Sequence, residues 1–135
     1  MRPQLAVREI ALGGVVLLAG AIALAVLAHF RHHTHTGPQP VGSYTALAGS
    51  SGPAAFGRKT ACGGVITQDT EGVSHPTLPC GARIFLTFHG HTVLVQVIDR
   101  GPYSSGRQFD VTDALARRLG LSGVQEVHWS YARAG

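Results

Sequence analysis

The pattern of hydrophobic and polar residues divides the chain into an apolar N-terminal segment and a C-terminal part with short alternating runs. Residues 10–30 are almost wholly apolar, and no charged side chain lies between Glu9 and Arg31. Because about 20 such residues cross a bilayer as a helix, this segment is predicted to be a transmembrane anchor. A cleaved signal peptide is the alternative, since two arginines precede the segment and residues 23–25 read Ala-Leu-Ala.

Two alternating runs in the second half of the chain predict a β-hairpin. Apolar residues occupy every second position in residues 83–88 and again in residues 91–98, and His89 and Gly90 provide a tight turn between them. The residues expected on the buried faces are Ile84, Leu86, Phe88, Val93, Val95 and Val97.

A short helix and a final strand are predicted after the hairpin. Thr112 is placed to cap the helix, Asp113 lies in its first turn, and Gly120 ends it. Residues 124–131 are predicted to form the last strand. Short strands, many glycines and one helix favour a compact barrel over a β-sandwich or a doubly wound sheet.

These elements predict four regions along the chain. A cytoplasmic tail spans residues 1–9, the transmembrane or signal segment 10–30, a flexible linker 31–55 and a folded domain 56–135. The linker is inferred from a high content of Gly, Pro, Ser and Ala with little periodicity. Four histidines between residues 29 and 35 leave open a metal site or a flexible tract, although no nearby residue fixes a metal geometry.

The two cysteines, Cys62 and Cys80, both lie in the C-terminal part. An even pair in an exported chain predicts a disulfide, whereas a zinc site would need further closely spaced Cys or His ligands. Together with the apolar segment 10–30, the pair predicts a single-pass protein of the cell membrane with its C-terminal domain outside the cytoplasm. If the N-terminal segment is cleaved, the protein is expected to be secreted.

The charge of the chain argues weakly against nucleic acid as a partner. The formal net charge is +4, and half of it precedes Gly37, so the exported part is only mildly basic. Nucleic-acid binding usually needs a concentrated basic face. A mildly basic domain is compatible with an anionic polymer such as cell-wall glycan.

A carboxylate and a guanidinium end the second strand of the predicted hairpin. Asp99 and Arg100 follow a run of aliphatic residues and precede a Gly-Pro turn, which places ionisable groups at the rim of a sheet. Such a position suits a catalytic carboxylate, because the strand fixes the position of the carboxylate and apolar neighbours raise its pKa. A simple salt bridge between the two residues is the alternative.

Four segments stand in a characteristic order: residues 57–63 (GRKTACG), 74–81 (SHPTLPCG), 99–103 (DRGPY) and 106–111 (GRQFDV). In this order and spacing they resemble the RlpA-like double-psi β-barrel domain, which is related in fold to barwin and the expansins. The resemblance implies a six-stranded barrel with a substrate groove across it. Some members are lytic transglycosylases, which cleave the glycan strands of peptidoglycan and need no cofactor or metal.

The resemblance also assigns roles to individual residues. Asp99 matches the family aspartate implicated in catalysis and is predicted to be the general acid and base. His75 is predicted to support it by binding a sugar or orienting Asp99; a loop histidine satisfied by backbone groups is the alternative. Arg100, Tyr103 and Asp110 are predicted to bind substrate, and Asp110 alternatively fixes the turn before the helix.

The chain departs from the family pattern at two positions. Gly64 and Thr67 stand where transglycosylase members carry a glutamate and an aspartate, and neither side chain can transfer a proton. Asp69 and Glu71 lie in the same loop and are candidates to compensate. A noncatalytic glycan-binding or expansin-like wall-loosening module is therefore the alternative function.

Overall fold

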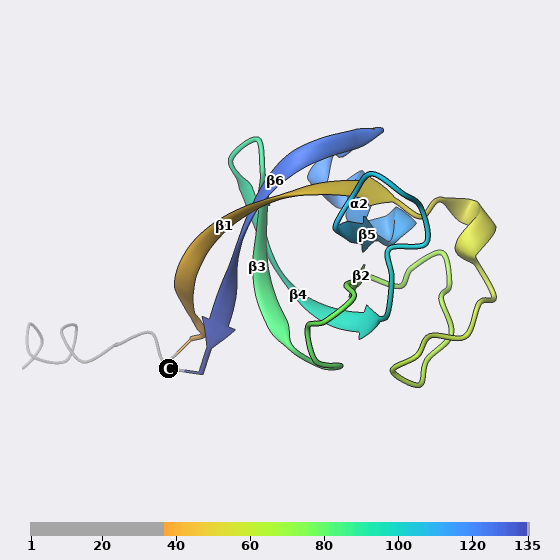
Figure 1. Ribbon diagram of the computed structural model, residues 1–135, viewed down its shortest axis with the longest axis horizontal. Coiled ribbons are helices and arrows are strands. Elements are labelled where there is room, and N and C mark those ends of the chain that lie inside the picture. Colours follow the sequence, from red (N-terminus) through yellow and green to blue (C-terminus); the bar gives the residue numbers. More distant parts are fainter. Residues whose placement is uncertain (1–36, 135) are drawn as a thin grey trace, which may run out of the picture. The chain divides into compact units, whose positions relative to one another are not determined.

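The computed structural model describes residues 37–134, which form one compact unit (Figure 1). The predicted cytoplasmic tail, the transmembrane or signal segment and the start of the linker lie outside the described residues. Between residues 37 and 134, no helix has the length and apolar character needed to cross a bilayer.

The described chain is a closed barrel of six β-strands with one α-helix, in the order β1-β5-β2-β4-β3-β6 around the barrel. This arrangement confirms the predicted mainly-β barrel. A short 3-10 helix, η1 (Pro53–Ala55), follows the first strand. The strands are β1 (Gln39–Ser50), β2 (Val73–Ser74), β3 (Arg83–Phe88), β4 (His91–Asp99), β5 (Phe109–Val111) and β6 (Val124–Arg133), and the helix is α2 (Asp113–Leu119).

The strand β1 corrects the predicted linker, because residues 39–50 belong to the barrel. β1 pairs along most of its length with β6 in antiparallel orientation, and its last three residues pair with β5 in parallel orientation. Its inward positions are small: Ala46 and Ala48 are buried, and Gly49 leaves room for the side chain of Arg107. Alanine and glycine have weak strand propensity, so pairing with distant strands determines this element.

The predicted hairpin is confirmed, since β3 pairs with β4 in the register that brings Phe88 opposite His91. His89 and Gly90 both have positive φ, as a two-residue type I′ turn requires. The six apolar side chains predicted to be buried all lie in the core.

Helix α2 is also where it was predicted, and Thr112 occupies its N-cap position. The Thr112 side chain does not cap the helix, however. Its hydroxyl accepts the backbone N–H of Gly72 at 3.1 Å, so it joins the helix start to the chain entering β2. Gly120 ends the helix in the left-handed conformation.

Candidate functional site

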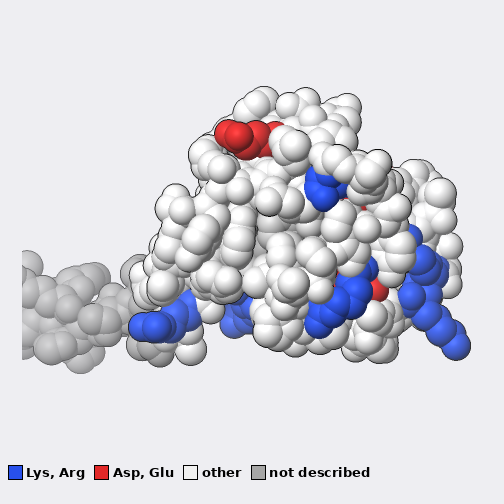
Figure 2. Space-filling view, viewed as in Figure 1, with Lys and Arg blue, Asp and Glu red and all other residues white. Residues whose placement is uncertain are grey.

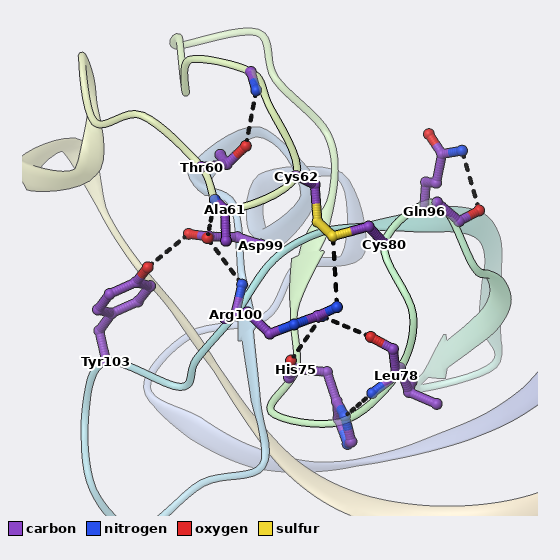
Figure 3. The surroundings of a disulfide bond; sticks show 12 residues. Thr60, Ala61, Cys62, His75, Leu78, Cys80, Gln96, Asp99, Arg100 and Tyr103 are labelled. Atoms are coloured by element: carbon purple, nitrogen blue, oxygen red, sulfur yellow. Dashed lines mark hydrogen bonds between the residues drawn. A yellow bond between two sulfur atoms is a disulfide. The ribbon is translucent and has the colours of Figure 1, made fainter.

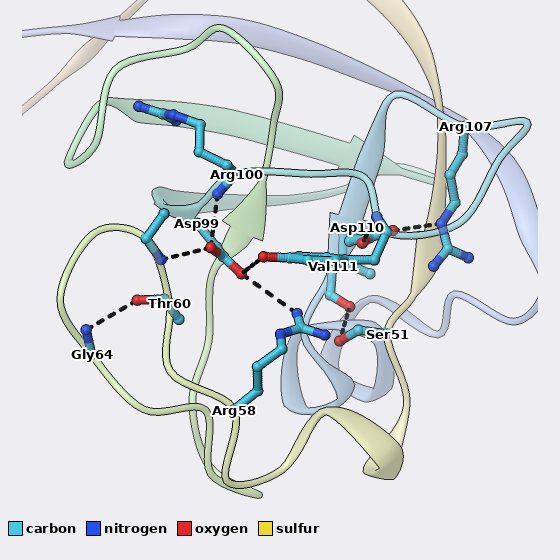
Figure 4. A network of polar contacts seen from close by, with 11 residues as sticks. Ser51, Arg58, Thr60, Gly64, Asp99, Arg100, Arg107, Asp110 and Val111 are labelled. Carbon is cyan, nitrogen blue, oxygen red and sulfur yellow. Dashed lines mark hydrogen bonds and ion pairs between the residues drawn. The ribbon is translucent and has the colours of Figure 1, made fainter.

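Asp99 is the last residue of β4 and its side chain is completely buried at the end of the barrel (Figure 4). The strand alternation that buries Val95 and Val97 turns the Asp99 carboxylate toward the same inner side. A buried carboxylate needs hydrogen-bond donors to offset its lost hydration.

Four groups donate to the Asp99 carboxylate, and they divide between its two oxygens. Oδ1 accepts the backbone N–H groups of Ala61 and Arg100, each at 2.8 Å. Oδ2 accepts the hydroxyl of Tyr103 at 3.0 Å and the guanidinium of Arg58 at 3.5 Å. One oxygen is thus held by backbone and the other by side chains.

The two side chains on Oδ2 also contact each other. The guanidinium carbon of Arg58 lies 3.9 Å from the centre of the Tyr103 ring, a cation–π arrangement. Partial burial, reinforced by the hydrogen bond and the negative charge of Asp99, raises the pKa of Tyr103 above its ordinary value of 10.0. The Nε of Arg58 is buried without a hydrogen-bond partner.

Asp110, on β5, is a second buried carboxylate, and it holds the segment that carries Tyr103. Its Oδ2 accepts the backbone N–H of Tyr103 at 2.7 Å, and its Oδ1 accepts Nε of Arg107 at 2.6 Å. The phenol of Tyr103 therefore donates a hydrogen bond to Asp99, and its backbone N–H donates one to Asp110. In this arrangement Asp110 fixes the loop and has no oxygen free of a protein donor.

Arg100 does not form a salt bridge with Asp99, which was the alternative to a catalytic role, because its side chain points to another loop (Figure 3). Its guanidinium donates to the carbonyl of Leu78 at 2.6 Å and of His75 at 3.4 Å, and lies 3.5 Å from Sγ of Cys80. The cation paired with Asp99 is Arg58 instead. No sequence signal beyond its place in the GRKTACG segment points to Arg58, which lies 41 residues before Asp99.

The imidazole of His75 makes no hydrogen bond with Asp99 in the described part of the chain. Its Nδ1 accepts the backbone N–H groups of Thr77 and Leu78, at 3.2 and 3.1 Å, and its ring packs 4.7 Å from the ring of Phe109. Burial, and then the nearby charge of Arg100, lower the pKa of His75 below its ordinary value of 6.5. These contacts assign a neutral ring with its proton on Nε2.

The predicted disulfide between Cys62 and Cys80 is confirmed. It joins the loop that supplies Ala61 to the loop that Arg100 holds (Figure 3). The disulfide thus connects the two segments that flank the carboxylate.

The positions that depart from the family pattern lie in the loop before β2. Gly64 is exposed, and an added Cβ would meet nothing closer than the Thr60 hydroxyl at 3.7 Å. The hydroxyl of Thr67 pairs with that of Thr70 at 3.0 Å. Glu71 is bound to Arg118 of α2 at 2.6 Å, and Asp69 is exposed; neither carboxylate contacts Asp99.

A cavity of about 470 Å³ lies beside this loop and is lined by Gly64, Gln96 and Ile98 among others. The lining includes Gln96, Val97 and Ile98 of β4 and both cysteines of the disulfide, but not Asp99. Within residues 37–134, no group of three His, Cys, Asp or Glu side chains is arranged to hold a metal ion.

A family model described as lytic transglycolase matches residues 49–131. The chain belongs to this family. A probable endolytic peptidoglycan transglycosylase RlpA of Synechocystis is 39% identical over 85 residues, covering 60% of this chain and 26% of the relative. An endolytic peptidoglycan transglycosylase RlpA of Yersinia pestis is 38% identical over 87 residues, covering 63% and 24%. The chain thus spans about a quarter of the length of these curated relatives.

Solved structures share the double-psi β-barrel fold of this lytic transglycolase domain. The Streptomyces papain inhibitor has a TM-score of 0.54 and 22% identity, over 70% of this chain and 97% of the inhibitor. An expansin of Clavibacter michiganensis without ligand has a TM-score of 0.55 and 20% identity, over 70% and 52%. A variant of that expansin, in complex with cellohexaose, has a TM-score of 0.52 and 15% identity, over 68% and 51%.

Proposed function

We propose that this domain cleaves the glycan strands of peptidoglycan as a lytic transglycosylase, with Asp99 as its general acid and base. The observation that carries the proposal is the position of Asp99: its Oδ1 is fixed by backbone, whereas its Oδ2 is bound only by two side chains. Family membership and the names of the RlpA relatives support the choice of substrate.

The reaction needs one carboxyl group to act twice. Asp99 first donates a proton to the glycosidic oxygen as the bond between that oxygen and the anomeric carbon breaks. The resulting carboxylate then takes the proton of the same sugar's 6-hydroxyl, whose oxygen bonds to the anomeric carbon and forms a 1,6-anhydro ring. Because the nucleophile belongs to the substrate, the second carboxylate of common glycoside hydrolases is not required.

The residues around Asp99 have separate tasks in this proposal. The amides of Ala61 and Arg100 hold Oδ1 and orient the carboxyl group, which leaves Oδ2 as the oxygen that exchanges protons. The cation of Arg58 lies beside Oδ2 and stabilises the carboxylate formed after the first proton transfer. His75 contributes through its backbone, whose N–H donates to the Asp99 carbonyl at 3.2 Å.

The charge on the visible face of the domain is compatible with a cell-wall glycan as substrate. Uncharged atoms cover most of the face in Figure 2, and basic and acidic groups are scattered over it. Four of the arginines of the described domain are already paired with carboxylates. We place the domain outside the cytoplasm, held by the N-terminal segment or secreted if that segment is cleaved; the disulfide supports an oxidising compartment.

A noncatalytic glycan-binding or expansin-like module is the second candidate, and two observations favour it. Gly64 replaces a glutamate of the transglycosylase members, and the Asp99 side chain has no exposed surface in this structure. The cellohexaose complex of an expansin shows a glycan bound to a protein that contains the same fold.

Digestion of purified cell walls separates the two candidates. The protein is incubated with peptidoglycan, soluble products are analysed by mass spectrometry for 1,6-anhydro muropeptides, and the bound fraction is measured by pelleting. Anhydro products support the transglycosylase. Pelleting without anhydro products supports the binding module. If neither pelleting nor anhydro products are observed, both candidate functions fail.

A further inference from the structure

The two oxygens of Asp99 differ in how easily a ligand can reach them. Oδ1 is bound by two backbone amides, which move only if the loops around them move. Oδ2 is bound by the ends of the Tyr103 and Arg58 side chains, and the Tyr103 hydroxyl leaves the carboxylate when its side-chain torsions change. With both in place, no surface of the Asp99 side chain is exposed.

We infer that Tyr103 and Arg58 form a cap over Asp99 whose displaceable part is Tyr103, and that a glycan oxygen replaces the Tyr103 hydroxyl on Oδ2 while Arg58 stays beside that oxygen. The inference about this Tyr103–Arg58 cap rests on the proposed function, because a glycan substrate must supply the oxygen that replaces the Tyr103 hydroxyl. The hydroxyl of Tyr103, 3.0 Å from Oδ2, occupies the position that a reacting sugar hydroxyl or glycosidic oxygen must take.

The surroundings of Tyr103 allow its ring to move while its backbone stays. The residue is 56% exposed, and its ring lies beside Gly101, where an added Cβ would come within 3.3 Å of the ring, so only a glycine leaves room for the ring there. Its backbone N–H is held by Asp110, which Arg107 also binds. Rotation of the side chain therefore uncovers Oδ2 without unfolding the loop.

A second observation, on Arg58, also indicates that a ligand binds beside Asp99. Its Nε is buried and has no hydrogen-bond partner, an arrangement that costs free energy in a folded protein. An oxygen of a bound glycan beside Oδ2 would satisfy this donor. Arg58 then exchanges its cation–π contact with Tyr103 for a contact with the substrate.

The first test needs no substrate and measures access to Asp99 in the folded full chain. The protein is treated with a water-soluble carbodiimide and an amine, and modification of Asp99 is followed by peptide mass spectrometry. We expect at least tenfold faster modification in Tyr103→Ala than in the wild type or in Tyr131→Ala, a matched exposed tyrosine. Equal rates in the three proteins overturn the cap.

The second test follows the Tyr103 hydroxyl when glycan binds. Ring carbons of tyrosine are labelled, and the Tyr103 pKa is measured by NMR with and without soluble glycan-strand oligosaccharides. We expect bound glycan to lower the Tyr103 pKa toward its ordinary value, because the hydrogen bond to Asp99 is lost. Glycan that shifts other signals while the Tyr103 titration stays unchanged overturns the displacement.

Removing the Tyr103 hydroxyl tests the same displacement through the affinity for glycan. Tyr103→Phe keeps the ring and its contact with Arg58 but removes the competitor for Oδ2, so glycan is expected to bind about tenfold more tightly. Tyr131→Phe is expected to bind as the wild type does. Weaker binding by Tyr103→Phe means that the hydroxyl contacts glycan directly and overturns the proposal. If no protein binds glycan, the proposed function fails, and carbodiimide access alone still decides whether the cap exists.

Discussion

The backbone N–H of Ala61 donates to Oδ1 of Asp99 at 2.8 Å, although the two residues are 38 positions apart in the chain. The next residue, Cys62, is bonded to Cys80, and the Arg100 side chain holds the loop that ends there. The hydrogen bond from Ala61, the disulfide and the contacts of Arg100 therefore link both loops to the end of β4 that carries Asp99. The position of the carboxylate depends on two loops that the disulfide joins.

Removing the disulfide is expected to destabilise the domain. Cys62→Ser combined with Cys80→Ser frees a loop with a sequence separation of 18, which lowers the free energy of unfolding by about 3 kcal/mol. Urea unfolding monitored by fluorescence measures this change. Wild-type protein in reductant is the control and should match the double variant. An unchanged urea midpoint in both would contradict the expected role of the bond.

Removing the Asp110 carboxylate is expected to destabilise the domain far more than removing the partly exposed carboxylate of Asp113. Asp110→Ala leaves the largely buried Arg107 unpaired, so the free energy of unfolding should fall by about 3–5 kcal/mol. Asp113→Ala, which removes the partner of the exposed Arg117, should cost about 1 kcal/mol or less. Equal losses in the two variants, measured by urea unfolding, would show that burial of the Asp110 pair does not matter.

His75 is expected to titrate below its ordinary value of 6.5, because burial and the charge of Arg100 disfavour its protonated form. As the pH falls below about 6.5, the unfolded chain takes up this proton before the folded one does. The contribution of His75 to stability is therefore present above that pH and is lost as the pH falls through the folded pKa. NMR titration of the imidazole signals tests this, with exposed His128 as the comparison; a His75 midpoint at or above 6.5 would be inconsistent with it.

A carboxylate restored at position 64 is expected to raise the yield of 1,6-anhydro products severalfold. Gly64→Glu fits the loop, because an added Cβ meets nothing closer than 3.7 Å. Gly64→Gln has the same shape without the proton-transferring group and serves as the control. If both variants release product at the wild-type rate, the missing glutamate does not limit this domain.

The parts of the fold with strong local patterns were predictable from the sequence. The alternation of Ile84, Leu86 and Phe88 defined β3, the turn at His89 and Gly90 gave the hairpin, and Gly120 marked the end of α2. The disulfide followed from an even pair of cysteines.

The parts that depend on distant partners were not predictable. Strand β1 reads as a linker because its inward residues are alanines, and its pairing with β6 involves residues 75 to 94 positions away. Arg58 was missed for the same reason, since only the closed barrel brings it to Asp99. The likeness of the DRGPY segment to its family located the carboxylate but gave no sign that Tyr103 covers it.

The most direct measurement compares peptidoglycan digestion by the wild-type domain and by Asp99→Asn. The substitution keeps the shape and burial of the side chain but removes the group that exchanges protons, and the bound fraction on cell walls serves as the control for folding. The proposed chemistry predicts 1,6-anhydro muropeptides from the wild type and at least a hundredfold fewer from Asp99→Asn, with pelleting retained. Anhydro products formed equally by both proteins would contradict the assignment of Asp99 as the acid and base.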